Sequence, residues 1–126
     1  MNLILEMQKY IVKTFKEKIG INLYNYEIGE EKYPFGTIQN IALTDTLLFP
    51  SKQLYSATLH IFSNQKSNTE IAIILQKVKN AFNECNTNIL NYKVISVPST
   101  STKLTKNKDG NWIGLIDIKF SIINYH

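Results

Sequence analysis

The sequence contains no arginine and a single cysteine, Cys85, in 126 residues. All 14 basic side chains are lysines, so the planar guanidinium group that recognises phosphates and base edges is missing. One cysteine excludes an internal disulfide framework and a cysteine-rich metal site. No stretch approaches the roughly 20 apolar residues of a membrane span. The N-terminus reaches Glu6 without the basic start of a signal peptide, so a reducing cytoplasm is expected.

Groups that carry catalysis are also few. The sequence has no glycine-rich phosphate loop, no nucleophile elbow and no histidine–carboxylate metal spacing. His60 lies on the polar side of an alternating segment, which favours a surface histidine over a general base. Cys85 fits a buried, inert thiol better than a nucleophile. Glu27, Glu30 and Glu31 flank a turn and are more typical of a solvated loop than of a metal or acid/base pair. We expect no enzyme, no cofactor and no metal.

The remaining composition is that of an ordinary globular domain. Hydrophobic residues make up 44% and charged residues 19% of the chain, and a length of 126 residues suits one domain, 1–126. The net charge is +4, but the lysines are spread along the whole chain. Richness in Ile, Lys, Asn and Tyr is typical of an AT-rich genome. The excess of basic over acidic residues therefore does not by itself indicate a nucleic-acid partner.

Two segments have the apolar spacing of amphipathic helices. Residues 2–19 place Ile4, Met7, Ile11 and Phe15 on one face, and Gly20 is expected to end this helix in the left-handed conformation. The second helix is expected to begin with a capping box formed by Ser67 and Glu70. Its apolar stripe consists of Ile71, Ile74, Leu75, Val78 and Phe82.

Strands are expected at 21–28, 35–45 and 54–63, separated by turns at 29–32 and 48–52. Between 54 and 63, Tyr55, Ala57, Leu59 and Ile61 alternate with polar residues. A long arm over 91–125 is expected to fold back at a two-residue turn, Asp109-Gly110. Together these patterns predict a single α+β domain: an antiparallel sheet, two helices on one face, and a long β-hairpin arm.

The arm contains the most unusual segment, "PSTSTKLTKNKDGNW" at 98–112. Lys103, Lys106, Lys108, Asp109 and Trp112 are candidates for contacts with another subunit or a partner. An exposed hairpin tip explains the same serines, threonines and lysines, and both interpretations stay open. A nucleic-acid surface would need aromatic residues interleaved with the cations, and only Trp112 is present.

In order, the segments resemble the tail-completion, or tail terminator, family of long-tailed bacteriophages. The resemblance covers the opening helix, the proline-led strand "YPFGTIQN" (33–40), and "YSATLHIFSNQKSNTEIAIILQKVKNAF" (55–82), where a strand is joined to a helix by a short polar loop. It ends with the alternating strand "DGNWIGLIDIKFSI" (109–122). No catalytic motif takes part in it.

The resemblance implies a structural phage protein that caps the tail tube as a ring, typically of six subunits. Such a ring ends tail polymerisation and provides the docking surface for the head. Its partners would be other copies of itself, the tail tube protein and the head connector protein, with DNA only passing through its lumen and no membrane. It would be made in the host cytoplasm and lie at the head–tail junction of the virion. Alternatives are a connector-side head–tail joining protein and a small lysine-rich nucleic-acid-binding domain.

Overall fold

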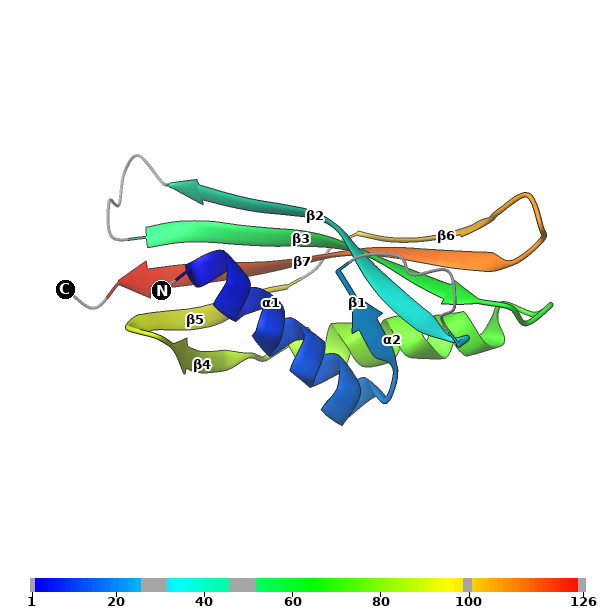
Figure 1. Cartoon of the computed structure of the whole chain (residues 1–126), viewed down its shortest axis with the longest axis horizontal. Coiled ribbons are helices and arrows are strands. Elements are labelled where there is room, and N and C mark those ends of the chain that lie inside the picture. The colour runs from blue at the N-terminus through cyan, green and yellow to red at the C-terminus, as the bar shows by residue number, and fades with distance from the viewer. Residues whose placement is uncertain (1, 26–31, 46–51, 99–100, 125–126) are drawn as a thin grey trace.

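The computed structural model describes residues 2–25, 32–45, 52–98 and 101–124. These form one curled β-sheet with both helices packed against one of its faces (Figure 1). In chain order, the elements are α1 (Leu3–Thr14), η1 (Phe15–Ile19), β1 (Asn22–Tyr24), β2 (Phe35–Asp45), β3 (Lys52–Ser63), α2 (Thr69–Asn83), β4 (Asn86–Ile89), β5 (Tyr92–Val97), β6 (Thr102–Lys106) and β7 (Trp112–Asn124). The predicted fold class, α+β with two helices on one side, is confirmed.

The sheet is built around β7, the longest strand. Its strand order is β1-β2-β3-β7-β5-β4, and β6 pairs with β7 on the side where β5 also pairs. β5 pairs with residues 119–124 of β7 and β6 with residues 112–116, so the two strands follow one another along the same edge. All pairs are antiparallel except β1–β2, which is parallel. The predicted hairpin arm is therefore present, and its return strand is the centre of the sheet.

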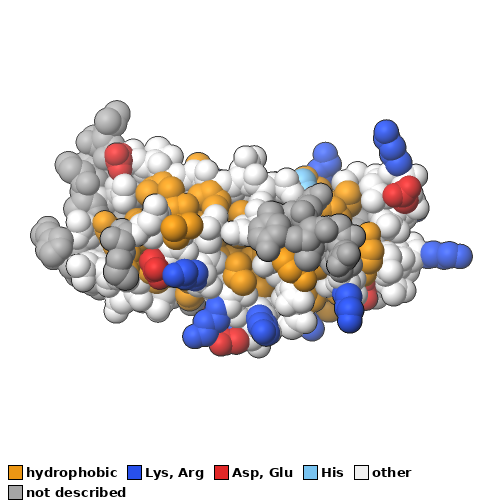
Figure 2. Space-filling view, in the orientation of Figure 1, with side chains coloured by type: hydrophobic (Ala, Val, Ile, Leu, Met, Phe, Trp, Pro, Cys, Tyr) orange, Lys and Arg blue, Asp and Glu red, His pale blue; other side chains and the backbone are white. Residues whose placement is uncertain are grey.

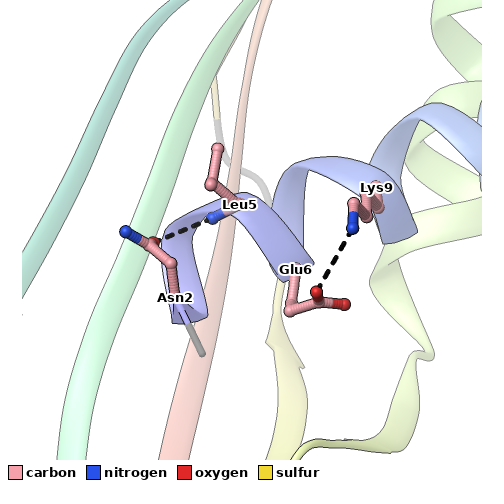
Figure 3. A network of polar contacts seen from close by, with 4 residues as sticks. All are labelled: Asn2, Leu5, Glu6 and Lys9. Carbon is pink, nitrogen blue, oxygen red and sulfur yellow. Dashed lines mark hydrogen bonds and ion pairs between the residues drawn. The ribbon is translucent and has the colours of Figure 1, made fainter.

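The first helix starts and ends where local chemistry dictates. The Asn2 side chain accepts a hydrogen bond from the Leu5 backbone N–H at 3.1 Å, while Lys9 and Glu6 pair at 3.4 Å one turn on (Figure 3). This N-cap satisfies one of the backbone donors left free at a helix start. After Thr14 the helix widens into the π-helical turn η1, and Gly20 then ends it at φ 85°, the left-handed stop that the sequence predicts.

The core lies between the helices and the inner faces of β3 and β7. The predicted alternation in β3 is confirmed, because Tyr55, Ala57, Leu59 and Ile61 are all buried. The predicted stripe of α2 is confirmed as well, from Ile71 to Phe82. An aromatic cluster joins the layers: the Phe82 ring centroid lies 5.8 Å from that of Phe15 in η1 and 6.0 Å from that of Phe120 in β7.

Three sequence-based predictions need correction or fall partly outside the described residues. Ile4 is 37% exposed and does not share the buried face of Met7, Ile11 and Phe15. Of the strand expected at 21–28, the structure has β1 at 22–24; residues 26–31, with Glu27, Glu30 and Glu31, lie outside the described residues, as does most of the 48–52 turn.

The capping box expected from Ser67 and Glu70 is wrong. The N-cap of α2 is Asn68, and the Ser67 hydroxyl accepts from the N–H of Thr69, the first residue of α2, at 3.1 Å. Glu70 instead accepts a hydrogen bond from the buried Ser63 hydroxyl at 2.7 Å, at the end of β3. This bond ties the first turn of α2 to the strand that precedes it. Ser67 and Glu70 therefore both stabilise the start of α2, but each does so through a different partner and not through the reciprocal bonds of a capping box.

Tyr55 is fully buried, and its hydroxyl finds no hydrogen-bond partner among the described residues. Burial raises the pKa of Tyr55 to about 12, above the value of about 10 for an exposed tyrosine. The unfolded chain therefore releases this proton at lower pH than the folded chain. The free energy of unfolding should fall as pH rises from about 10 to about 12, by roughly 2–3 kcal/mol from this residue.

We expect Tyr55→Phe to raise the free energy of unfolding by about 1 kcal/mol at neutral pH, because it removes a buried hydroxyl without a partner and keeps the ring. The same variant should lose stability less steeply above pH 10. Urea denaturation at pH 7, 10 and 11 measures both effects. A loss of stability at pH 7 would show that the hydroxyl is satisfied after all.

Candidate partner-binding site

The predicted turn at Asp109-Gly110 forms the loop of the β6–β7 hairpin, but it is not a two-residue turn. Asn107 and Asn111 still pair, with Asn107 N–H donating to the Asn111 carbonyl at 2.9 Å. The Asn107 side-chain oxygen accepts from the backbone N–H groups of Asp109 and Asn111, both at 3.0 Å. Gly110 has φ 81°, the left-handed residue of a three-residue hairpin loop. Asn107 thus fixes a loop that presents Lys108 and Asp109 to solvent.

Trp112 anchors the start of β7 to the opposite layer. Its indole N–H donates to the Lys66 carbonyl, in the loop before α2, at 3.1 Å. The Lys106 ammonium lies 4.9 Å from the centroid of the Trp112 ring, within range of a cation–π interaction. The sequence gives no local sign of the bond to Lys66, because the two residues are far apart along the chain. Trp112 therefore positions the hairpin and also contacts one of its lysines.

The three candidate lysines do not form one cluster. Lys106 pairs with Trp112 and Lys103 with Leu115, so the two lysines project from opposite faces of the sheet. Lys108 lies in the loop between the strands, and all three lysines and Asp109 are exposed. The structure thus brings together Lys106 and Trp112, places Lys108 and Asp109 at the tip, and separates Lys103. Such a divided arrangement lacks the single cationic surface that would follow a nucleic-acid backbone.

The residues considered for catalysis lie apart from one another. His60 is on the helix-free face, with its ring centroid 6.3 Å from that of Phe62. Cys85 follows α2, is buried, and forms a hydrogen bond with the Tyr10 hydroxyl. Burial, and then this hydrogen bond, raise the pKa of Tyr10 above its ordinary value. Among the described residues, no group of three His, Cys, Asp or Glu side chains could hold a metal ion. None of the helices in the described parts of the chain is long and apolar enough to cross a membrane.

The structure also shows a surface that the sequence did not indicate, along the outer side of β2. β1 pairs only with residues 35–37, so residues 38–45 have no neighbouring strand on that side in the described parts of the chain. On the helix side of the sheet, the start of α1 exposes Ile4 and Leu5, which is 53% accessible. Figure 2 shows hydrophobic side chains gathered over the start of α1. Edge position depends on strand order, which no local pattern reveals.

Comparison with known proteins adds one finding about the fold. No protein-family model and no curated protein matches the chain. Among solved structures, a chain of the virion of a native gene transfer agent (GTA) particle matches it with a TM-score of 0.65 and 7% identity. The match covers 90% of this chain and 90% of that chain. At this identity the likeness shows a common fold.

Proposed function

We propose that this chain is a structural protein of a phage-type particle. The observation that carries the proposal is the fold likeness to a virion chain, which extends over 90% of both proteins. The resemblance to phage tail terminators noted above supports the same class from independent data, the order of the segments in the sequence. The segments that carry that resemblance correspond to α1, β2, the β3–α2 unit and β7.

Within this class, we assign the chain to the end of the tail tube. A tube grows because each ring exposes the surface that recruits the next ring. A terminator must match the tube on one side and offer no such surface on the other. The protein would form a ring, of six subunits in the family that its sequence resembles, that ends polymerisation and receives the head. It would contact its own copies, the tail tube protein and the head connector protein, with DNA passing through the lumen.

In this proposal the β6–β7 hairpin binds a neighbouring subunit or the tube and takes no part in catalysis. Trp112 and the Asn107-centred loop hold Lys106, Lys108 and Asp109 in defined positions at one end of the molecule. A preorganised polar tip loses little conformational entropy when it meets a neighbouring subunit or the tube. We assign the protein no catalytic step, cofactor or metal.

Removing the gene from the phage and imaging the lysate tests the proposal. We expect tails of abnormal length and filled heads that remain unattached. Normal-length tails joined to heads would refute the assignment. Heads that leak DNA beside normal tails would instead favour a connector-side joining protein. Strong, salt-dependent DNA binding by the purified protein would favour the nucleic-acid alternative.

Complementation then tests the hairpin tip. The unchanged gene should restore normal tails, whereas K108A/D109A should fold normally, because both side chains are exposed, and should restore them poorly. Circular dichroism of the purified variant checks the fold. Full restoration by a folded K108A/D109A variant would show that the tip is only an exposed loop.

A further inference from the structure

The described sheet ends on both sides in strands with an unpaired edge: β1 and the open part of β2 on one side, β4 and β6 on the other. On one side, residues 38–45 of β2 extend beyond the short strand β1. On the other side, β6 pairs only with β7 and leaves its second edge open. Open edges in soluble proteins are usually protected, often by lysines. The sequence from residue 33 to residue 51 contains no lysine, although the chain has 14. Among the described residues, no strand occupies the β2 edge beyond β1, and no lysine of this segment opposes pairing with another strand.

The two edges have compatible directions. β2 and β7 are both antiparallel to β3, and β6 is antiparallel to β7, so β6 runs antiparallel to β2. A second copy placed beside the first in a similar orientation therefore presents its β6 antiparallel to the open part of β2. Antiparallel pairing is the slightly more stable of the two arrangements.

Each edge is accompanied by a matching feature on the helix side of the sheet. Beside β2, Gln8 of α1 lines a small hollow with residues 38–41, and Ile4 and Leu5 lie one turn earlier on α1. These two side chains project as an apolar knob, 37% and 53% exposed. Beside β6, a groove of about 330 Å³ separates this strand from α2. Its apolar walls include Ala72, Leu75 and Leu104.

The charges of the two edges also differ. Asp45 is the only charged residue in β2, and it lies in the open part of the strand. Lys103 and Lys106 belong to β6, and Lys79 lies at the adjoining groove. Two copies of the β6 edge would repel each other, whereas β6 opposite β2 brings lysines toward a lysine-free strand that carries one carboxylate.

We propose that residues 38–45 of β2, with Ile4 and Leu5, dock onto β6 and the α2–β6 groove of a second copy of this chain. The contact joins two different surfaces, so it repeats from copy to copy and can close into a ring. This inference rests on the proposed ring and specifies its interface. The open part of β2 is level with residues 116–122 of β7, whereas β6 is level with residues 112–116. Paired copies are therefore staggered along the strands, which in a closed ring inclines the strands to its axis.

Cross-linking of the full-length chain tests this interface. In the double variant L5C/A72C, a short bis-maleimide should link the knob of one copy to the groove of the next and give a ladder of multimers. The unchanged chain, whose only thiol is the buried Cys85, should give none. The experiment is done on concentrated purified protein and on phage particles that carry the variant.

Matched lysine variants show whether the knob drives association. Adding Leu5→Lys of α1 to a strand-edge cross-linking pair, N40C/T105C, should reduce the ladder about tenfold, as expected for loss of a well-packed interface side chain. Ile73→Lys is the control, because Ile73 is also 53% exposed but lines a different groove, which Ile19 of η1 also lines. An equal reduction by both lysines would overturn the proposal.

The remaining outcomes separate this inference from the proposed function. No ladder in particles, although gene removal gives abnormal tails, would overturn the interface and leave the function standing. A ladder together with normal tails after gene removal would support the interface and refute the function. Efficient dimers from L5C alone, without a ladder from the double variant, would indicate a two-fold contact and overturn the proposal.

Discussion

Replacing Phe82 with alanine is expected to lower the free energy of unfolding by about 3–5 kcal/mol. Phe82 is 3% exposed, and its ring lies between those of Phe15 and Phe120. The truncation leaves a cavity where α2, η1 and β7 meet, and three different elements cannot all move to fill it. Urea or thermal denaturation of the purified variant measures the loss.

Ile73→Ala in the same helix is the matched control. Ile73 is 53% exposed, so this change should alter the free energy of unfolding by less than about 0.5 kcal/mol. A Phe82→Ala variant that unfolds at nearly the same urea concentration as the unchanged chain would contradict the placement of α2 on the sheet. Similar losses from both variants would indicate a general effect on the helix and not a cavity at Phe82.

The sequence predicts the layers of this fold well because burial in them follows a regular period. The apolar stripe of α2 repeats at helical spacing, and burial alternates with period two from Tyr55 to Ser63 in β3 and from Gly114 to Ile122 in β7. Opposite residues in this pair, such as Tyr55 and Phe120, therefore share the inner face. Long elements with one buried face can be predicted from sequence, because burial of that face requires apolar residues at regular intervals.

The errors occur where this regularity stops. Near Gln39 the register of β2 against β3 shifts by one residue, so Ile38 and Ile41 both face the helices although three positions separate them. β1 is parallel to β2, a pairing that depends on the path of the chain and not on local spacing. Ile4 fits the helical stripe but lies at the start of α1, where its side chain stays 37% exposed. In each of these three cases, the contacts with other elements determine the structure, and the local sequence pattern does not.

The candidate site was predictable only in part for the same reason. The Asp-Gly pair locates the hairpin, and two-residue periodicity places Lys103 and Lys106 on opposite faces once β6 is known. The anchor from Trp112 to Lys66 and the open edge of β2 require the arrangement of the whole sheet. Interfaces of this kind are properties of strand order. They contain no local motif that a sequence could display.

Gly114 determines how closely α2 approaches the centre of the sheet. A Cβ atom at this position would lie 2.9 Å from Leu75 Cδ1, 3.0 Å from Cδ2 and 3.1 Å from Cγ. Leu75 is itself buried and also forms part of the α2–β6 groove. Any side chain on Gly114 must therefore move Leu75, and with it the wall of the surface that we propose for subunit contact.

We expect Gly114→Val to lower the free energy of unfolding by about 1–3 kcal/mol, because overpacking of a closed core displaces neighbouring side chains. Combining it with Leu75→Ala should cost less than the sum of the two single changes, since the smaller side chain leaves room for valine. Denaturation of the four proteins in this cycle measures the coupling. Strictly additive losses would show that Leu75 does not restrict position 114. If the groove is a subunit contact, Gly114→Val should also weaken cross-linking of the L5C/A72C pair at temperatures where the variant remains folded.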